Sequence, residues 1–263
     1  MIDLHCHILP GIDDGAQDPE EALEMARMAI DEGFSGIVAT PHYGSGKFLS
    51  DINAVNRLVV ELNQELEARN IKLTIFPGME VRLTADVLES LSTGKILSIN
   101  QGPYVLMELP IALVPAGFEN FVRMVLESGK KLVLAHPEKN LEIQRHPEII
   151  YNLLTAFKPG DLLMQITADS ITGDAGLSAL STAKYLLEND LAHILATDAH
   201  SAVERPPRIS NALDVVSSIV GNERANKMVK DCPRDILAGR EVHCDPPKKR
   251  TKKRKSFWGL FRR

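Results

Sequence analysis

Hydrophobic residues in this chain follow two alternating patterns. Seven short apolar runs are separated by longer segments whose apolar positions repeat every three to four residues. The short runs predict strands at residues 2–5, 36–40, 73–76, 104–108, 131–135, 162–166 and 193–196. The longer segments predict helices at residues 18–32, 51–69, 116–128, 147–157, 174–189 and 207–220. Such alternation is typical of a mostly parallel sheet covered by helices.

Seven predicted strands in 263 residues favour one α/β domain, because single α/β barrels have this size. We therefore expect a distorted seven-stranded barrel. The dipeptide Pro246-Pro247 predicts the domain boundary. Residues 1–245 would form the folded domain, and residues 246–263 a flexible basic and aromatic tail.

The composition is that of an ordinary globular protein, with 44% hydrophobic and 25% charged residues. The N-terminal residues lack the basic and apolar pattern of a signal peptide, and no apolar run is long enough to span a membrane. The three cysteines are too scattered for a disulfide framework, which fits a reducing compartment. We therefore expect a cytoplasmic protein.

The net charge of −5 hides a strong asymmetry between the domain and the tail. Residues 248–263 contain nine of the 30 lysines and arginines and no acid, so the remaining 21 bases face 35 acids, a formal charge of −14. This acidic body argues against nucleic-acid binding and suits metal cations. The tail has three interpretations: a solvated segment, a contact with anionic lipid at the inner face of the membrane, or a contact with an acidic partner.

Histidine, aspartate or glutamate follows six of the seven predicted strands. In a barrel the loops after the strands gather on one face, where active sites lie. One such residue is weak evidence, but six in register at the same strand ends are hard to produce by chance. The candidate metal ligands are His5, His7, Asp14, His42, Glu80, Glu108, His136, Asp198 and His200.

The spacing of these residues has a physical reason. Alternate residues of a strand point to the same side, so His5 and His7 can face one cation while Cys6 points away. Nine ligands are too many for one ion, and with one bridging carboxylate they suit two or three. Mixed imidazole and carboxylate ligands favour Mn, Fe or Zn over Ca or Mg. Such a cluster predicts hydrolysis of a phosphate ester.

The motifs around these residues resemble those of the PHP superfamily of polymerase and histidinol phosphatase domains. Within it, residues 2–16 (IDLHCHILPGIDDGA) are similar to the signature of bacterial metal-dependent protein-tyrosine phosphatases of capsule and exopolysaccharide operons. The other motifs follow in that family's order: 39–42 (ATPH), 77–80 (PGME), 135–138 (AHPE) and 197–200 (TDAH). The resemblance covers nearly the whole chain.

The resemblance implies a distorted seven-stranded PHP barrel with three metal ions, usually Mn²⁺. It implies one ion on His5, His7, Glu80 and Asp198, a second on Glu80, Glu108 and His136, and a third on Asp14, His42 and His200. It implies that a metal-bound hydroxide hydrolyses phosphotyrosine on a partner tyrosine kinase or its substrates, which would regulate capsule or exopolysaccharide synthesis.

Three cations are candidates for contacting the phosphate. Arg205 matches a position where the family binds phosphate, and Arg208 is a second candidate. Lys139 stands where close relatives carry arginine, so it keeps the charge but loses the bidentate fork. We expect all three to bind substrate, and Arg205 and Lys139 to take part in catalysis.

Three rival functions are open: a PHP phosphatase for a small molecule such as histidinol phosphate, a PHP nuclease, and a non-enzymatic metal-binding adaptor. The spacing of Cys244 and Arg250 also matches the Cys-x5-Arg loop of cysteine-based tyrosine phosphatases. That loop cradles phosphate with backbone N–H groups. Here two prolines remove donors, so we expect Cys244 to have no catalytic role.

Overall fold

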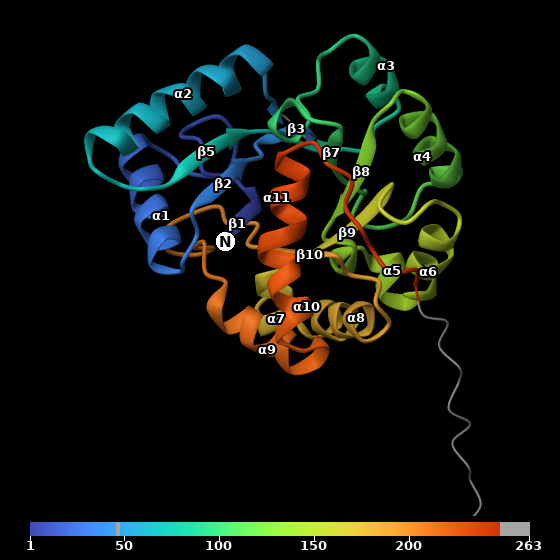
Figure 1. Ribbon diagram of the computed structural model, residues 1–263. Helices are drawn as coiled ribbons and strands as arrows, with labels where there is room; N and C mark the ends of the chain where they lie inside the picture. The colour runs from blue at the N-terminus through green and yellow to red at the C-terminus, as the bar shows by residue number, and fades with distance from the viewer. Residues whose placement is uncertain (46–47, 248–263) are drawn as a thin grey trace, which may run out of the picture.

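The computed structural model describes residues 1–45 and 48–247. Strands run through the middle of the molecule and helices surround them (Figure 1). All six predicted helices are present, each within three residues of its predicted bounds. Of the proposed tail at residues 246–263, residues 248–263 lie outside the described residues.

The strands of the described chain are β1 Ile2–Cys6, β2 Gly36–Ala39, β3 His42–Ser45, β4 Phe48–Leu49, β5 Thr74–Pro77, β6 Glu80–Arg82, β7 Tyr104–Glu108, β8 Lys131–Ala135, β9 Leu162–Thr167 and β10 Ile194–Ala196. Its α-helices are α1 Pro19–Asp31, α2 Ile52–Ala68, α3 Val87–Ser92, α4 Phe118–Glu127, α5 Leu141–Arg145, α6 Glu148–Thr155, α7 Ala168–Thr172, α8 Leu177–Glu188, α9 Ser210–Val220, α10 Asn222–Asn226 and α11 Cys232–Leu237. Shorter helical turns are 3₁₀ at Ile99–Gln101 and Pro137–Lys139 and π at Lys227–Asp231.

The strands form two sheets. β1, β2 and β5 make a three-stranded sheet, and the larger sheet has the order β10-β9-β8-β7-β6-β3-β4. The pair β3–β4 is antiparallel, and the other pairs between described strands are parallel. The predicted α/β class with parallel strands is therefore confirmed.

The pairing differs from the distorted seven-stranded barrel that the sequence predicts, because the described strands pair as two sheets that do not close into one barrel. Two predicted strands are each followed closely by a strand that the sequence does not predict: β3 begins after Thr40 and Pro41, and β6 begins after Gly78 and Met79. Pro41 has no N–H to donate to a neighbouring strand. A Cβ at Gly78 would lie 2.8 Å from Val38 Cγ1, so the backbones approach closely there. β1 and the end of β10 meet through an isolated parallel bridge from Cys6 to Ala199 rather than a full ladder.

Both faces of the strands are buried. The larger apolar core lies between the strands and the helices. A second core is formed by residues of several strands, including Leu4, Val38 and Val133, together with Ile236 of α11 and Val242. In Figure 1, α11 lies across the strands that it covers. Burial on both sides explains why the strands appear as continuous apolar runs in the sequence.

Short elements are the ones that the hydrophobic pattern does not predict. They include β4, β6, α3, α5 and α7, each six residues or shorter. A strand of two or three residues, or a helix of one or two turns, contains too few apolar positions to establish a period. Across residues 1–45 and 48–247, no helix has both the length and the apolar character needed to cross a bilayer.

Candidate metal centre

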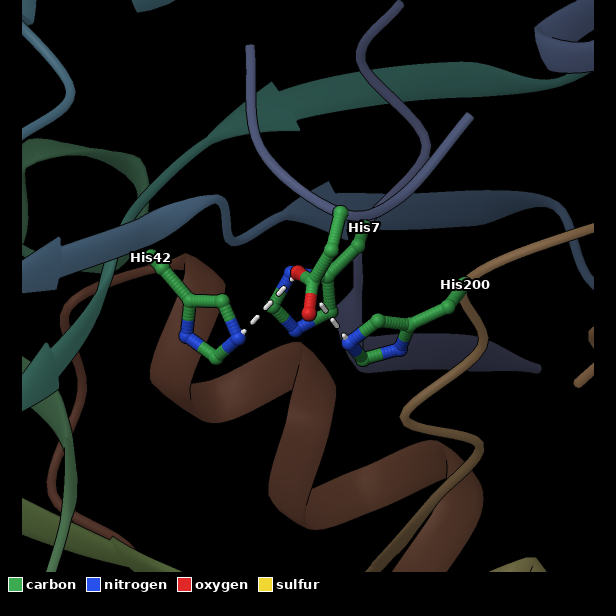
Figure 2. A group of neighbouring side chains, drawn as sticks. His7, His42 and His200 are labelled. Carbon is green, nitrogen blue, oxygen red and sulfur yellow. Dashed lines mark ion pairs between the residues drawn. The ribbon is translucent and has the colours of Figure 1, made fainter. Parts of the chain in front are cut away.

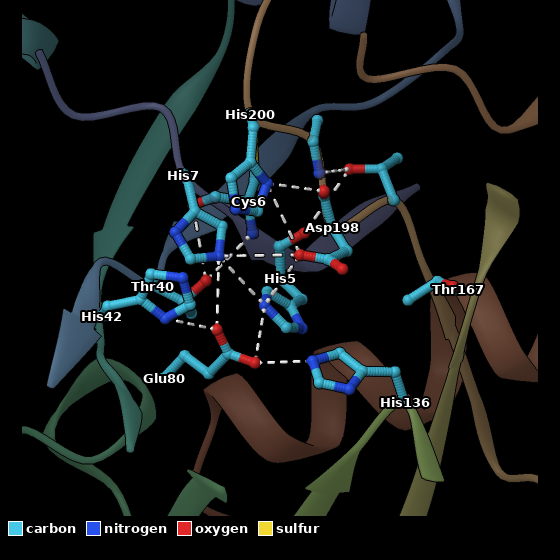
Figure 3. Close-up of polar contacts among 12 residues, drawn as sticks. His5, Cys6, His7, Thr40, His42, Glu80, His136, Thr167, Asp198 and His200 are labelled. Carbon is cyan, nitrogen blue, oxygen red and sulfur yellow. Dashed lines mark hydrogen bonds and ion pairs between the residues drawn. The ribbon is translucent and has the colours of Figure 1, made fainter. Parts of the chain in front are cut away.

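The nine predicted ligands lie together, and Figure 3 labels all of them except Asp14 and Glu108. Most follow the C-terminal end of a strand or end it, whereas His42 and Glu80 are the first residues of β3 and β6. One ligand atom from each member lies within 4.8 Å of the others in four overlapping groups: His7, Asp14, His42 and His200; His5, His7 and Glu80; His5, His136 and Asp198; and His42, Glu80 and Glu108. Every predicted ligand belongs to at least one group. Their assignment as ligands stays a prediction.

The groups overlap with the three sets that the family resemblance implies without matching them fully. Asp14, His42 and His200 stay together, but His7 joins them. Asp198 groups with His5 and His136 rather than with His7 and Glu80. The shared histidines show that the sites are contiguous, with neighbouring positions close enough to use the same side chain.

His5 and His7 face each other from alternate positions at the end of β1. Their Nε2 atoms are 3.2 Å apart, and Cys6 between them packs in the apolar core. The other nitrogen of each ring has a partner: His5 Nδ1 lies 3.0 Å from Gln165 Oε1, and His7 Nδ1 lies 2.7 Å from Asp13 Oδ2. These contacts fix each ring so that Nε2 points at the centre, as outer partners of metal-bound histidines do.

Glu80 is the hub of the cluster and is 1% exposed. Its Oε1 lies 2.7 Å from His136 Nε2 and 3.4 Å from His5 Nε2. Its Oε2 lies 2.9 Å from His42 Nδ1 and 3.5 Å from His7 Nε2. Burial opposes ionisation, but the surrounding histidines hold the pKa of Glu80 well below its usual range. Both oxygens are therefore placed to bridge cations.

Asp14 joins the cluster from the loop after β1. Its Oδ1 lies 3.4 Å from His42 Nε2 and 3.7 Å from His200 Nε2. Figure 2 shows how the rings of His42 and His200 lie on either side of His7. The Asp14 side chain is 54% exposed, so this edge of the cluster is open to solvent. His200 Nδ1 is 2.9 Å from the Asp198 carbonyl oxygen, which directs Nε2 towards Asp14. A substrate can therefore approach from this side.

The donor set fits divalent cations. His42 Nδ1 is buried and makes no hydrogen bond of good geometry, although it lies 2.9 Å from Glu80 Oε2. Burial opposes protonation of His7 and His136, but their carboxylate neighbours outweigh it and raise the pKa of His7 to about 10 and that of His136 to about 9. Cations would replace these protons and compensate the same carboxylates.

The backbone is strained at two of the nine residues. His136 has φ 33° and Asp198 has φ 56°, in the left-handed region that residues other than glycine rarely adopt. His136 directly follows the end of β8, and Asp198 lies two residues after the end of β10. Such strain persists where surrounding structure enforces it and is common at functional sites. Here it turns both side chains towards the cluster (Figure 3).

Two of the three predicted phosphate-binding cations border the cluster. Arg205 Nη2 lies 2.7 Å from Asp198 Oδ2, and Lys139 Nζ lies 3.0 Å from the same oxygen. Lys139 also contacts Asp169 at 2.9 Å. Arg208 is exposed, and its charge acts on Glu32 beyond the end of α1. The geometry therefore favours Arg205 and Lys139 over Arg208.

Several supporting residues are absent from the sequence-based site. Asp13 and Gln165 orient the histidines, and Arg82 Nη1 lies 3.4 Å from Glu108 Oε1. Buried Asp3 accepts a hydrogen bond from the Thr197 N–H at 3.0 Å. Gln165 and Asp3 are polar residues inside otherwise apolar strands, and that pattern could have identified them. Nothing in the hydrophobic pattern distinguishes Asp13 or Arg82.

Cys244 is not set up as a nucleophile. Burial, together with nearby Cys232 and Asp245, raises the pKa of its thiol to about 12. Its Sγ lies 3.9 Å from the Val242 carbonyl oxygen, among the residues that cover the second core. A thiol with this pKa is protonated at neutral pH, which agrees with the expectation of no catalytic role.

Comparison with known proteins agrees with the motifs. A family described as "Capsular polysaccharide synthesis, CpsB/CapC" matches residues 1–238. The chain is 34% identical to the tyrosine-protein phosphatase YwqE of Bacillus subtilis over 261 residues, which cover 99% of this chain and 100% of YwqE. It is 33% identical over 206 residues to a putative tyrosine-protein phosphatase, CapC, of Staphylococcus aureus, with 78% and 79% of the two chains covered.

Solved structures extend the comparison to the fold. A crystal structure reported for YwqE from Bacillus subtilis and CpsB from Streptococcus pneumoniae, described as metal-dependent tyrosine phosphatases, matches 96% of this chain and 100% of that one with a TM-score of 0.89. Histidinol phosphate phosphatase from Lactococcus lactis matches 85% of this chain and 93% of its own with a TM-score of 0.55 at 15% identity, a likeness of fold alone. The present chain belongs to the CpsB/CapC capsular polysaccharide synthesis family, whose model matches residues 1–238, and the grouping of its candidate metal ligands agrees with that assignment.

Proposed function

We propose that this chain is a metal-dependent protein-tyrosine phosphatase, which hydrolyses phosphotyrosine to tyrosine and inorganic phosphate. The observation that carries the proposal is the convergence of nine histidine and carboxylate side chains at one strand edge. It occurs in a chain that is 34% identical, over nearly its full length, to a tyrosine-protein phosphatase. The capsular polysaccharide family supports a role in capsule or exopolysaccharide synthesis.

The nine side chains would hold three ions, with Glu80 shared between two of them. Imidazole and carboxylate together suit Mn²⁺, and Fe or Zn would also bind such a set. When bound, these ions supply acidified water and neutralise charge on the phosphoryl oxygens. The buried histidines need no movement to serve, because Asp13 and Gln165 already fix the rings of His7 and His5.

Arg205 and Lys139 would bind the phosphate of the substrate. Both side chains contact Asp198 Oδ2, at 2.7 and 3.0 Å. Once Asp198 shares its charge with a cation, these two groups are less strongly held by it and can pair with phosphate oxygens. The Arg205 side chain is 41% exposed and the Lys139 side chain 22% exposed, so a ligand can reach both.

The substrate we propose is a phosphotyrosyl protein, namely a tyrosine kinase of the capsule system or a target of that kinase. We expect the protein itself to be cytoplasmic, where it could meet such a substrate. We further propose that the two sheets act as the wall of one distorted barrel, since the Cys6–Ala199 bridge joins β1 to the end of β10.

The domain and tail keep their proposed roles. Residues 1–245 would form the phosphatase, and residues 246–263 would contact anionic lipid through the nine bases that the tail carries. Cosedimentation of the full chain with anionic vesicles, compared with a chain ending at residue 247, tests the contact. Equal sedimentation of the two proteins would exclude it.

One assay separates the proposed activity from its rivals. Metal-stripped protein is reconstituted with Mn²⁺ and offered a phosphotyrosyl peptide, histidinol phosphate and single-stranded DNA at equal concentration. We expect the peptide to be hydrolysed with the highest kcat/KM and the DNA to remain intact. Faster hydrolysis of histidinol phosphate, or hydrolysis of the peptide that persists in excess chelator, would contradict the proposal.

A further inference from the structure

Exposed apolar side chains gather on the face that carries the candidate metal centre. Among the described residues, seven large hydrophobic side chains are exposed. Two lie on outer helices, Val60 on α2 and Met124 on α4. The other five lie in segments that follow the strands β7, β8, β9 and β10: Ile111, Leu113, Leu141, Leu177 and Val203. In a parallel sheet these segments share one edge with the strand ends.

Three of the five form a continuous patch, which we call the apolar rim: Ile111, Leu113 and Leu141. The Leu141 N–H donates to the Ile111 carbonyl oxygen at 2.8 Å. Buried Asn140 donates through Nδ2 to the carbonyl oxygen of Leu113 at 3.1 Å, which joins the loop after β7 to the loop after β8. The rim is therefore held by hydrogen bonds and keeps its apolar side chains 41–63% exposed.

The rim borders the metal centre on one side. Ile111 follows Glu108 by three residues, and Leu141 follows Lys139 by two. Lys139 in turn contacts Asp198 in the cluster. If a phosphate binds at Lys139, the rest of the substrate molecule that carries this phosphate can contact the apolar rim.

Val203 provides a second apolar contact on the other side. It is 85% exposed in the loop after β10, between His200 and Arg205. The His200 N–H donates to the Arg205 carbonyl oxygen at 2.9 Å, so the loop turns back on itself with Val203 in its outer part. In the sheet, β10 lies two strands from β8 and three strands from β7, so the strand ends that carry the rim are roughly 10 and 14 Å from the end of β10 at about 4.8 Å per strand.

We propose that the apolar rim and Val203 determine substrate specificity by contacting apolar side chains on both sides of a phosphotyrosine in a polypeptide. The inference rests on the proposed phosphatase function and goes on to specify its substrate. Separations of roughly 10–14 Å correspond to about three to four residues of extended chain at about 3.3 Å each, and the residues two before and two after a phosphotyrosine point to the same side as it does. An extended peptide with phosphate at Arg205 and Lys139 can thus cover both contacts, whereas a small phosphate ester cannot.

The test compares two phosphotyrosyl peptides of equal length and charge, one with leucine and one with serine at the positions two residues before and two residues after the phosphotyrosine. The readout is the ratio of their kcat/KM values, because an inactive fraction of protein cancels in that ratio. We expect wild-type protein to favour the leucine peptide. Each lost apolar contact should reduce the ratio about fivefold, so Val203→Ser reduces it about fivefold and Ile111→Ser with Leu141→Ser about 25-fold.

Val60→Ser and Met124→Ser are matched controls, since these side chains are 54% and 51% exposed but lie on α2 and α4. They should leave the ratio within twofold of wild type. The inference is overturned if wild type hydrolyses both peptides equally or if the rim variants keep the wild-type ratio. A change of the rim double variant from oligomer to monomer with an unchanged ratio would identify a contact between copies and also overturn it. Hydrolysis of neither peptide by reconstituted wild type would overturn the proposed function itself.

Discussion

Asp13 gives the sharpest test of how the metal centre is supported. Its side chain is buried, and Oδ2 lies 2.7 Å from His7 Nδ1 and accepts the His42 N–H at 3.0 Å. Oδ1 accepts the Gly15 N–H at 3.0 Å. The carboxylate therefore fixes one histidine ring and the backbone of a second histidine without belonging to any of the ligand groups. The variant Asp13→Asn keeps the shape of this side chain and removes its charge.

The expected loss follows from the contacts. A hydrogen bond to a charged group contributes about 1.5–3 kcal/mol. At 1.4 kcal/mol per factor of ten, that corresponds to a loss of roughly 10- to 150-fold. Loss of an outer partner of a metal-bound histidine costs about 10- to 100-fold in affinity or activity. The two estimates agree, so the Mn²⁺ concentration for half-maximal activity should rise about 10- to 100-fold in Asp13→Asn.

The measurement is a Mn²⁺ titration of metal-stripped protein, followed by hydrolysis of an aryl phosphate and by calorimetric binding. Asp18→Asn is the control, because Asp18 caps α1 by accepting the Glu21 N–H, and asparagine caps equally well. Its titration should coincide with that of wild type. Half-maximal activity of Asp13→Asn at the wild-type Mn²⁺ concentration would refute the supporting role of Asp13.

Three further predictions follow from the site and its surroundings. His136→Ala should abolish aryl phosphate hydrolysis while circular dichroism shows an intact fold, and chelation of the wild type should have the same effect; full activity in either case would exclude the metal mechanism. Cys244→Ser should leave kcat/KM unchanged, because the pKa of this thiol is raised to about 12, and a large loss would implicate the thiol. Burial lowers the pKa of His193 from 6.5 to about 4, so the unfolded state binds the extra proton first as the pH falls. The free energy of unfolding should therefore drop as the pH falls from about 6.5 to about 4. The drop should be smaller in His193→Asn, which keeps an acceptor for the Met164 N–H. Urea denaturation at several pH values measures this, and the same pH dependence of the free energy of unfolding in both proteins would contradict the prediction.

The sequence predicts the long elements and the strand-end motifs well, for physical reasons. A helix such as α2, with 17 residues, contains several repeats of its apolar period. His5 and His7 are predictable as neighbours because strand geometry alone places them on one side. Parallel strands then bring distant motifs, such as those at His136 and Asp198, to one edge.

Other features depend on contacts that the hydrophobic pattern does not contain. The breaks before β3 at Pro41 and before β6 at Gly78 reflect a missing donor and a close backbone approach rather than a change of hydrophobicity. Arg82 lies close to Glu108 because β6 pairs with β7, and the hydrophobic pattern does not predict the short strand β6. How the nine side chains are divided among ions depends on distances of a few ångströms, which no periodicity determines.

The bridge between the first strand and the end of β10 has a consequence for synthesis of the protein. The His7 N–H donates to the Ala199 carbonyl oxygen and the Asp198 N–H to the His5 carbonyl oxygen, both at 2.8 Å. The motif at His5 and His7 is synthesised first, and its hydrogen-bond partners at Asp198 and Ala199 follow about 190 residues later. At about 5–20 residues per second, this interval is roughly 10–40 seconds. A nascent chain cannot assemble the full ligand set before then. Assembly of the ligand set therefore depends on synthesis of the motif at residues 197–200, and products truncated before it should lack the assembled centre.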